Sequence, residues 1–196
     1  GKFLSGRIAN SLRILSPKFN LVELFINDQS SGIYIESENI NESFLRKNFI
    51  MPVNVYKVEQ ILSESIVALE ANAFNSPGVL SKRAVFNQVS YSDKSDFIYF
   101  YKLMRSSIDN KKKYLDLIDK IGIENWVKFA VYQIITQNFH NDNSHNFRLV
   151  SDPWSGHLIP IVYDPLINLT TNQQNYGLDI SSNDMFLLLN KGSHFQ

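Results

Sequence analysis

The sequence predicts an α+β fold, with a β-rich part in residues 1–50 and a mostly helical part in residues 51–196. Two kinds of pattern predict it: alternating polar and apolar runs joined by turns, and apolar residues at helical spacing. Of the 196 residues, 44% are hydrophobic and 13% are aromatic. A chain of this length and composition can bury a substantial core, so we expect it to fold without disulfides or structural metals.

The first part of the chain predicts a helix followed by a β-hairpin. Gly6–Leu15 has apolar residues at spacings of four and three, and Ser16-Pro17 would end the helix. Leu21–Asn27 alternates in polarity as a half-buried strand does, and a second extended run, Ile33–Glu36, follows a turn-rich segment. The apolar residues expected on one face of the first strand are Val22, Leu24 and Ile26.

Helical patterns dominate the middle of the chain. After a short helix that Asn41 would cap, Tyr56–Leu69 and Phe97–Met104 each fit one helical face. The strongest helix runs from about Ile123 to Asn138. Its expected core stripe consists of Val127, Ala130, Val131, Ile134 and Ile135. A second hairpin follows, in which Phe147–Val150 and Leu158–Val162 flank a turn that contains proline and glycine.

Charge and composition exclude some classes of function. Lys plus Arg and Asp plus Glu both total 19, so no bulk positive field exists to hold a nucleic acid, and we expect no nucleic-acid partner. The run Lys111-Lys112-Lys113 is too short for a basic patch and is typical of a solvated face. No apolar stretch approaches the length of a membrane span, and the chain has no cysteine. Because the sequence starts within a helical pattern and stops near an apolar segment, we expect a fragment truncated at both ends.

A polar segment between the strongest helix and the second hairpin is the most informative part of the sequence. Residues 140–146 are all polar, and Asp164 comes directly after the returning strand. A hairpin returns its far end beside its near end, so Asp142, Asn146 and Asp164 are expected in one small volume. Asn146 and Asp164 offer oxygens of the kind that Mg²⁺ prefers. Asp142 would be free to accept a proton from an attacking hydroxyl, as the catalytic-loop carboxylate of a phosphoryl-transfer site does.

Other interpretations of this segment stay open. Asn, Asp and Ser gather in any loop because they cap helices and form turns, and Asp164-Pro165 could start a turn. A zinc-dependent hydrolase that uses His140, Asp142 and His145 is a further alternative. The simple loop interpretation does not predict a carboxylate at the end of the returning strand.

Two motifs resemble the CotH kinase family, which is distantly similar to secretory-pathway protein kinases. The first motif runs from Leu24-Phe25-Ile26-Asn27 through Gly32-Ile33-Tyr34 to Glu38 and Phe44-Leu45. The second runs from Asp142 to Leu149 and continues through Asp152-Pro153 and Gly156 to Ile159–Asp164. The resemblance covers roughly residues 22–69 and 123–166.

The resemblance implies a protein-kinase-like bilobal fold with an incomplete small N-lobe and a mostly helical C-lobe. It implies ATP with Mg²⁺ or Mn²⁺ between the lobes, and γ-phosphoryl transfer to Ser or Thr of a protein substrate, such as a spore-coat or cell-surface protein. Mapped onto this sequence, Asp142 is the base, Asn146 and Asp164 are the metal ligands, and Glu38 lies near the nucleotide at the junction of the lobes. The implied location is extracellular or at the cell or spore surface.

The sequence departs from the family pattern in several places, of which the absent second acidic residue and the missing upstream region favour an alternative. The gap between Asp142 and Asn146 is short, Tyr163 stands where many members have Trp, and Leu166 stands where many have a further Asp. The family's phosphate-contacting basic residue would lie upstream of Gly1, and no glycine-rich phosphate loop is present. The alternative is therefore a kinase-shaped binding or assembly module that has lost catalysis.

Overall fold

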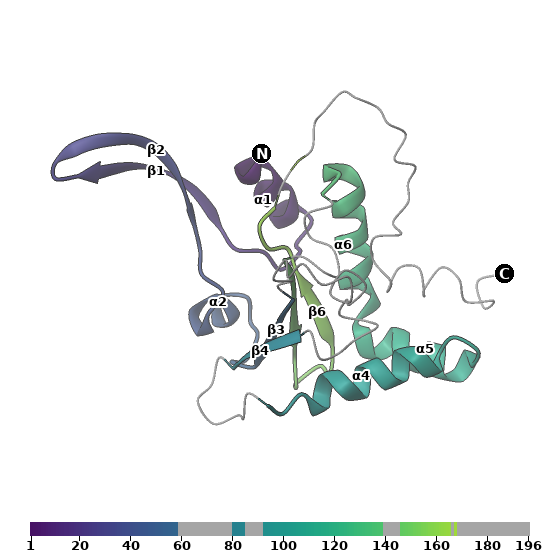
Figure 1. Cartoon of the computed structure of the whole chain (residues 1–196). Helices are drawn as coiled ribbons and strands as arrows, with labels where there is room; N and C mark the ends of the chain where they lie inside the picture. The colour runs from purple at the N-terminus through teal and green to yellow at the C-terminus, as the bar shows by residue number, and fades with distance from the viewer. Residues whose placement is uncertain (59–79, 85–91, 139–145, 166, 168–196) are drawn as a thin grey trace, which may run out of the picture.

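A computed structural model describes residues 1–58, 80–84, 92–138, 146–165 and 167 (Figure 1). It contains both helices and antiparallel sheets, so the predicted α+β class is confirmed. In chain order the elements are α1 (Lys2–Ser11), β1 (Phe19–Ile26), β2 (Gln29–Ser37), α2 (Glu42–Lys47), β3 (Asn54–Val58), β4 (Leu80–Ala84), α4 (Ser95–Ser106), α5 (Lys111–Ile121), α6 (Ile123–Thr136), β5 (Phe147–Ser151) and β6 (Leu158–Ile161).

A four-stranded antiparallel sheet with the order β4-β3-β5-β6 forms the centre of the molecule. Strand β5, one of the two inner strands of this sheet, is buried on both faces. Phe147 and Leu149 point toward the cluster formed with the helices, whereas Val150 points to the opposite cluster. Because successive side chains of a strand alternate between faces, one short strand holds both halves of the core together.

The two faces of the sheet carry separate hydrophobic clusters. Helices α1, α4, α5 and α6 cover one face, and their largest fully buried side chains are Phe97, Met104, Leu117, Trp126, Phe129 and Tyr132. The short helix α2 covers the other face with Phe44 and Leu45. Asn41 caps α2 as predicted, because its side-chain oxygen accepts a hydrogen bond from the backbone N–H of Phe44 at 3.0 Å.

The predicted core stripe of α6 is wrong for Val127, Val131 and Ile135, which are exposed, whereas Ala130 is partly buried and packs against the core as predicted. Val127 is 52% exposed and Ile135 is 56% exposed, while α6 buries Trp126, Phe129, Tyr132 and Thr136. The helix is apolar on more than one face, so helical spacing alone could not choose between the faces. The aromatic face is buried because large rings remove more apolar surface from water than Val or Ile does.

The first hairpin forms as predicted, but its expected half-burial is wrong. Strands β1 and β2 pair only with each other in the described part of the chain, and Figure 1 shows the ribbon projecting from the body. Apolar side chains are exposed on both faces: Ile33, on one face, is 68% exposed, and Ile26, on the other, is 55% exposed. Alternation correctly indicated a strand, but it does not tell whether a sheet lies against the core.

The remaining predictions have mixed outcomes. The second hairpin, the helix around Phe97–Met104 and a helix near the start of the chain are confirmed. The start of the predicted helix Tyr56–Leu69 is wrong, because Tyr56 and Val58 lie in strand β3, and its remainder lies outside the described residues. The three lysines 111–113 are exposed in the first turn of α5, a helix that the sequence did not predict. The division near residue 50 stays a prediction.

No helix among the described residues is both long enough and apolar enough to cross a membrane.

Candidate functional site

The β5–β6 hairpin brings Asn146 and Asp164 together. Asn146 directly precedes β5, and Asp164 follows β6 by three residues. The side-chain Nδ2 of Asn146 lies 3.5 Å from Oδ2 of Asp164. Both residues have left-handed backbone conformations, with φ of 52° and 47°, which Asn and Asp tolerate better than most residues. The hairpin therefore turns an amide and a carboxylate toward each other at its open end.

Lys2 reaches the same carboxylate from the first residue of α1. Its ammonium forms an ion pair with Oδ1 of Asp164, the oxygen opposite the one that faces Asn146. The side chain of Asp164 is 26% exposed and that of Lys2 is 48% exposed, so the lysine approaches from the solvent side. The sequence patterns did not predict a role for Lys2, because it lies 162 positions from its partner and no motif includes the start of the chain.

The position of α1 is fixed by close packing. Ser5 Oγ and the hydroxyl of Tyr132 on α6 lie 2.5 Å apart, and both side chains are buried. Gly6 faces the ring of Phe19 so closely that a Cβ atom at residue 6 would lie 2.4 Å from it. These contacts hold the start of α1 beside the chain that leaves β6 (Figure 1).

Buried Arg148 supports the residue next to Asp164. Its Nη1 donates hydrogen bonds to the backbone oxygens of Val58 and Phe147, each at 3.2 Å. Its guanidinium also lies over the ring of Tyr163, with Cζ 4.3 Å from the ring centroid. A cation over an aromatic face is attracted by the ring quadrupole, so Arg148 restrains Tyr163 and, through the chain, Asp164.

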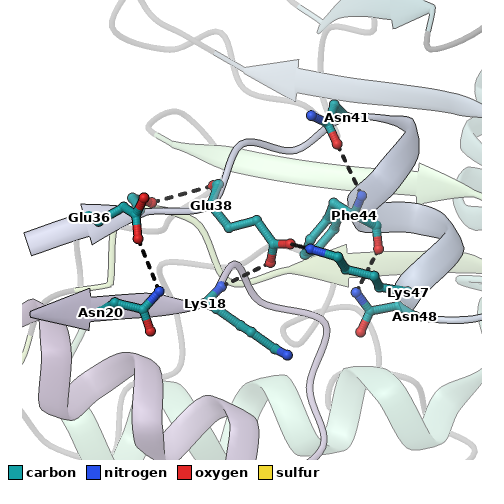
Figure 2. Close-up of polar contacts among 9 residues, drawn as sticks. Lys18, Asn20, Glu36, Glu38, Asn41, Phe44, Lys47 and Asn48 are labelled. Atoms are coloured by element: carbon teal, nitrogen blue, oxygen red, sulfur yellow. Dashed lines mark hydrogen bonds and ion pairs between the residues drawn. The ribbon is translucent and has the colours of Figure 1, made fainter. Parts of the chain in front are cut away.

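Glu38 joins the base of the first hairpin to α2 (Figure 2). Its Oε2 accepts a hydrogen bond from the backbone N–H of Lys18 at 3.2 Å, and its Oε1 lies 2.9 Å from Nζ of Lys47. Although Lys47 is exposed, the carboxylate is only 17% exposed. The structure thus shows a bridging contact for Glu38, and its predicted place near a nucleotide stays a prediction.

The remaining predicted residues lie outside the described part of the chain. These are the candidate base Asp142 and the candidate zinc ligands His140 and His145. Among the described residues, no three His, Asp or Glu side chains gather in a way that could hold a metal ion. The described donor set is one amide and one carboxylate, which fits Mg²⁺, because Mg²⁺ takes few protein ligands and completes its shell with water and phosphate.

A cavity of about 630 Å³ lies at the other end of the same hairpin, where its lining includes Asp96, Asp152 and His157. Burial alone would raise the pKa of Asp96, but hydrogen bonds from Tyr56, Asn54, Ser151 and the backbone of Phe97 outweigh it and hold that pKa below its usual value.

Both carboxylates of this cavity have structural roles. Asp96 receives four hydrogen bonds, which occupy the acceptor positions that a carboxylate offers. Asp152 accepts hydrogen bonds from Trp154 and Ser155 within the turn. Along β5, Ser151 at the edge of this cavity lies five residues from Asn146, about 17 Å at the usual rise per residue.

Comparison with protein families identifies the class to which the fold and this site belong. The family model described as "CotH kinase protein" matches residues 3–192, nearly the whole chain. The chain therefore belongs to the CotH kinase family, as the two sequence motifs predicted. No curated protein sequence matches it.

Proposed function

We propose that this chain is a protein kinase domain that binds ATP with Mg²⁺ or Mn²⁺ and transfers the γ-phosphoryl group to Ser or Thr of a protein. The contact between Asn146 and Asp164, at the open end of the hairpin, is the observation that carries the proposal. Membership of the CotH kinase family makes this chemistry the expected one. In the proposed bilobal arrangement, residues 1–50 contribute to a small lobe and residues 51–196 form the larger, mostly helical one.

Asn146 and Asp164 act as the metal ligands in this proposal. A rotation of the Asn146 side-chain amide by 180° would exchange its oxygen and nitrogen, so that the oxygen would take the position beside Asp164 that Nδ2 now holds. Asp164 then contributes a carboxylate oxygen beside it. The bound metal nucleotide supplies the phosphoryl group and offsets the charge that develops during its transfer.

Asp142 is proposed as the general base. It precedes Asn146 by four residues, and the order of base, amide, hairpin and carboxylate is the order of these groups in protein kinases. Its carboxylate would accept the proton of the attacking Ser or Thr hydroxyl. Glu38 is proposed to lie near the nucleotide, with its bridge to Lys47 joining the first hairpin to α2.

The substrate and location are proposed from the family alone. We propose that the protein lies outside the cell or at the cell or spore surface, and that its substrate is a protein of that surface. Recovery of phosphoserine or phosphothreonine from such proteins after incubation with the chain would support this placement.

Binding and transfer can be separated by two substitutions. Isothermal titration with Mg·ATP should show binding to the wild type and at least a tenfold loss in Asp164→Asn, because a charge-assisted contact is removed. Asp142→Ala should keep Mg·ATP binding, yet lose roughly 10²- to 10⁴-fold in the rate of labelled phosphate transfer to protein. Asp116→Asn, at an exposed position on α5, is the matched control. Equal Mg·ATP affinity in the wild type and Asp164→Asn would overturn the proposal.

A second candidate function is a kinase-shaped binding module without catalysis. Lys2 already neutralises Asp164, and Leu166, two residues after Asp164, supplies no second carboxylate. For such a module, Mg·ATP or Mn·ATP leaves the thermal midpoint unchanged. A ligand present at a hundred times its dissociation constant would instead stabilise the fold by about 2.7 kcal/mol.

A further inference from the structure

The carboxylate of Asp164 is held from two sides by groups of different kinds. On one oxygen lies the neutral amide of Asn146, and on the other lies the ammonium of Lys2. A divalent cation that binds Asp164 needs at least one of these oxygens. On either oxygen, the cation and the ammonium of Lys2 repel each other across one carboxylate, so metal binding at this site weakens the contact between Asp164 and Lys2.

Lys2 stands at a helix position that usually disfavours a cation. It is the first residue of α1, and no acidic residue lies in the first turn of that helix. The N-terminus of a helix carries a partial positive charge, which repels an ammonium and attracts anions. The contact with Asp164 offsets this repulsion in the metal-free protein.

The placement of Lys2 is built by packing, and does not depend on the ion pair alone. The buried Ser5–Tyr132 contact and the tight Gly6–Phe19 contact fix α1 one turn beyond Lys2. The lysine is long and half exposed, so its ammonium can swing by several ångströms without moving the helix. The ammonium can therefore leave Asp164 and still lie near the open end of the hairpin.

We propose that Lys2 exchanges partners when a metal nucleotide binds: it neutralises Asp164 in the free protein and contacts phosphate oxygens in the complex. This inference rests on the proposed function. Asp164 gives up the ammonium and takes the cation. One metal ion does not neutralise a triphosphate, so the released ammonium is attracted to the negative charge that remains on the phosphate oxygens. Lys2 then supplies the basic phosphate contact from within residues 1–196.

If Lys2 exchanges partners, its removal should change the affinity for the metal alone and the affinity for the metal nucleotide in opposite directions. Removing the ammonium in Lys2→Met frees Asp164 from a competitor, so Mn²⁺ alone should bind about threefold more tightly. The same substitution removes a charge-assisted phosphate contact, so Mn·ATP should bind about tenfold more weakly. Lys2→Arg keeps the charge and should bind Mn·ATP within about threefold of the wild type.

The measurements are titrations of free Mn²⁺ by electron paramagnetic resonance and of Mn·ATP by calorimetry, on wild type, Lys2→Met and Lys2→Arg. Lys128→Met is the matched control, because Lys128 also pairs with a carboxylate, Glu124, on the surface of α6. It should change neither affinity.

Shifts of opposite sign in Lys2→Met support the exchange. If both affinities weaken, Lys2 only orders the site, and if both tighten, it only competes with the metal. Either result, or no change in both, overturns the inference while the proposed function stands. A wild-type chain that binds no Mn·ATP contradicts the proposed function itself.

Discussion

Gly122 lies against the imidazole ring of His157, so closely that a Cβ atom at residue 122 would stand 2.7 Å from Nδ1 of the histidine. Gly122 has φ of 62° and joins α5 to α6, while His157 precedes strand β6. The absence of a side chain at Gly122 thus allows the connection between the two helices to pack directly against the hairpin that leads to Asp164.

Gly122→Ala should destabilise the protein by about 2 kcal/mol or more. About 1 kcal/mol comes from a left-handed backbone on a residue with Cβ, and the rest comes from displacing His157. Urea unfolding measures the loss. Gly32→Ala is the control, because φ is 98° at Gly32 and nothing lies within 4 Å of a Cβ there. The loss caused by Gly122→Ala should be smaller in a protein that also carries His157→Ala. If Gly122→Ala costs the same stability in both backgrounds, and no more than Gly32→Ala does, the close contact does not contribute to the loss.

Phe129 and Val131 test which face of α6 belongs to the core. Phe129 is fully buried and Val131 is 39% exposed. Phe129→Ala should lower the free energy of unfolding by about 3–5 kcal/mol, whereas Val131→Ala should change it by roughly 0.5 kcal/mol or less. Thermal and urea unfolding of the two variants measure this difference. Equal losses of unfolding free energy in the two variants would contradict the burial of the aromatic face of α6.

Arg148→Leu should lower the free energy of unfolding by about 2–4 kcal/mol. The substitution leaves the backbone oxygens of Val58 and Phe147 without this donor and removes the cation from the ring of Tyr163. Arg148→Lys should recover only part of the loss, because an ammonium lacks the planar fork of the guanidinium. A leucine variant as stable as the wild type in urea would show that the buried arginine contributes nothing.

Asp96 makes the stability of the fold depend on pH in the acid range. Its pKa is lower in the folded protein than in the unfolded chain, because hydrogen bonds, among them one from the hydroxyl of Tyr56, outweigh burial. Its contribution is complete above the unfolded-state pKa of about 3.9 and is lost as the pH falls through the lower folded value.

Between about pH 6 and about pH 3, the wild type should therefore lose more stability than Asp96→Asn, which cannot titrate at this position. Urea midpoints of both proteins at the two pH values measure the difference. Identical losses would show that the hydrogen bonds to Asp96 do not favour its ionised form.

Local patterns predicted the elements that local forces determine. Asn41 caps α2 because a side-chain oxygen satisfies a helical N–H three residues on, a relationship contained within the motif. The meeting of Asn146 and Asp164 was predictable for the same kind of reason, since hairpin geometry alone returns one end to the other.

Relationships set by packing between distant segments were beyond prediction. Lys2 meets Asp164 because α1 packs against distant segments, with Ser5 on Tyr132 as one contact, and nothing near Lys2 in the sequence encodes that packing. The burial of Trp126 in place of Val127 likewise depends on which face of α6 the sheet covers. Strand alternation in β1 gave the secondary structure but not the exposure, because exposure depends on what packs against the ribbon.

The most direct test of the central claim locates a paramagnetic ion by nuclear magnetic resonance. With ATP and a small amount of Mn²⁺, signals of Asn146, Asp164 and their neighbours should broaden first. The indole N–H of exposed Trp154, in the turn at the opposite end of the hairpin, should stay sharp. Broadening centred on Trp154 and the cavity beside Asp96, or none near Asn146, would contradict the assignment of the metal nucleotide to Asn146 and Asp164.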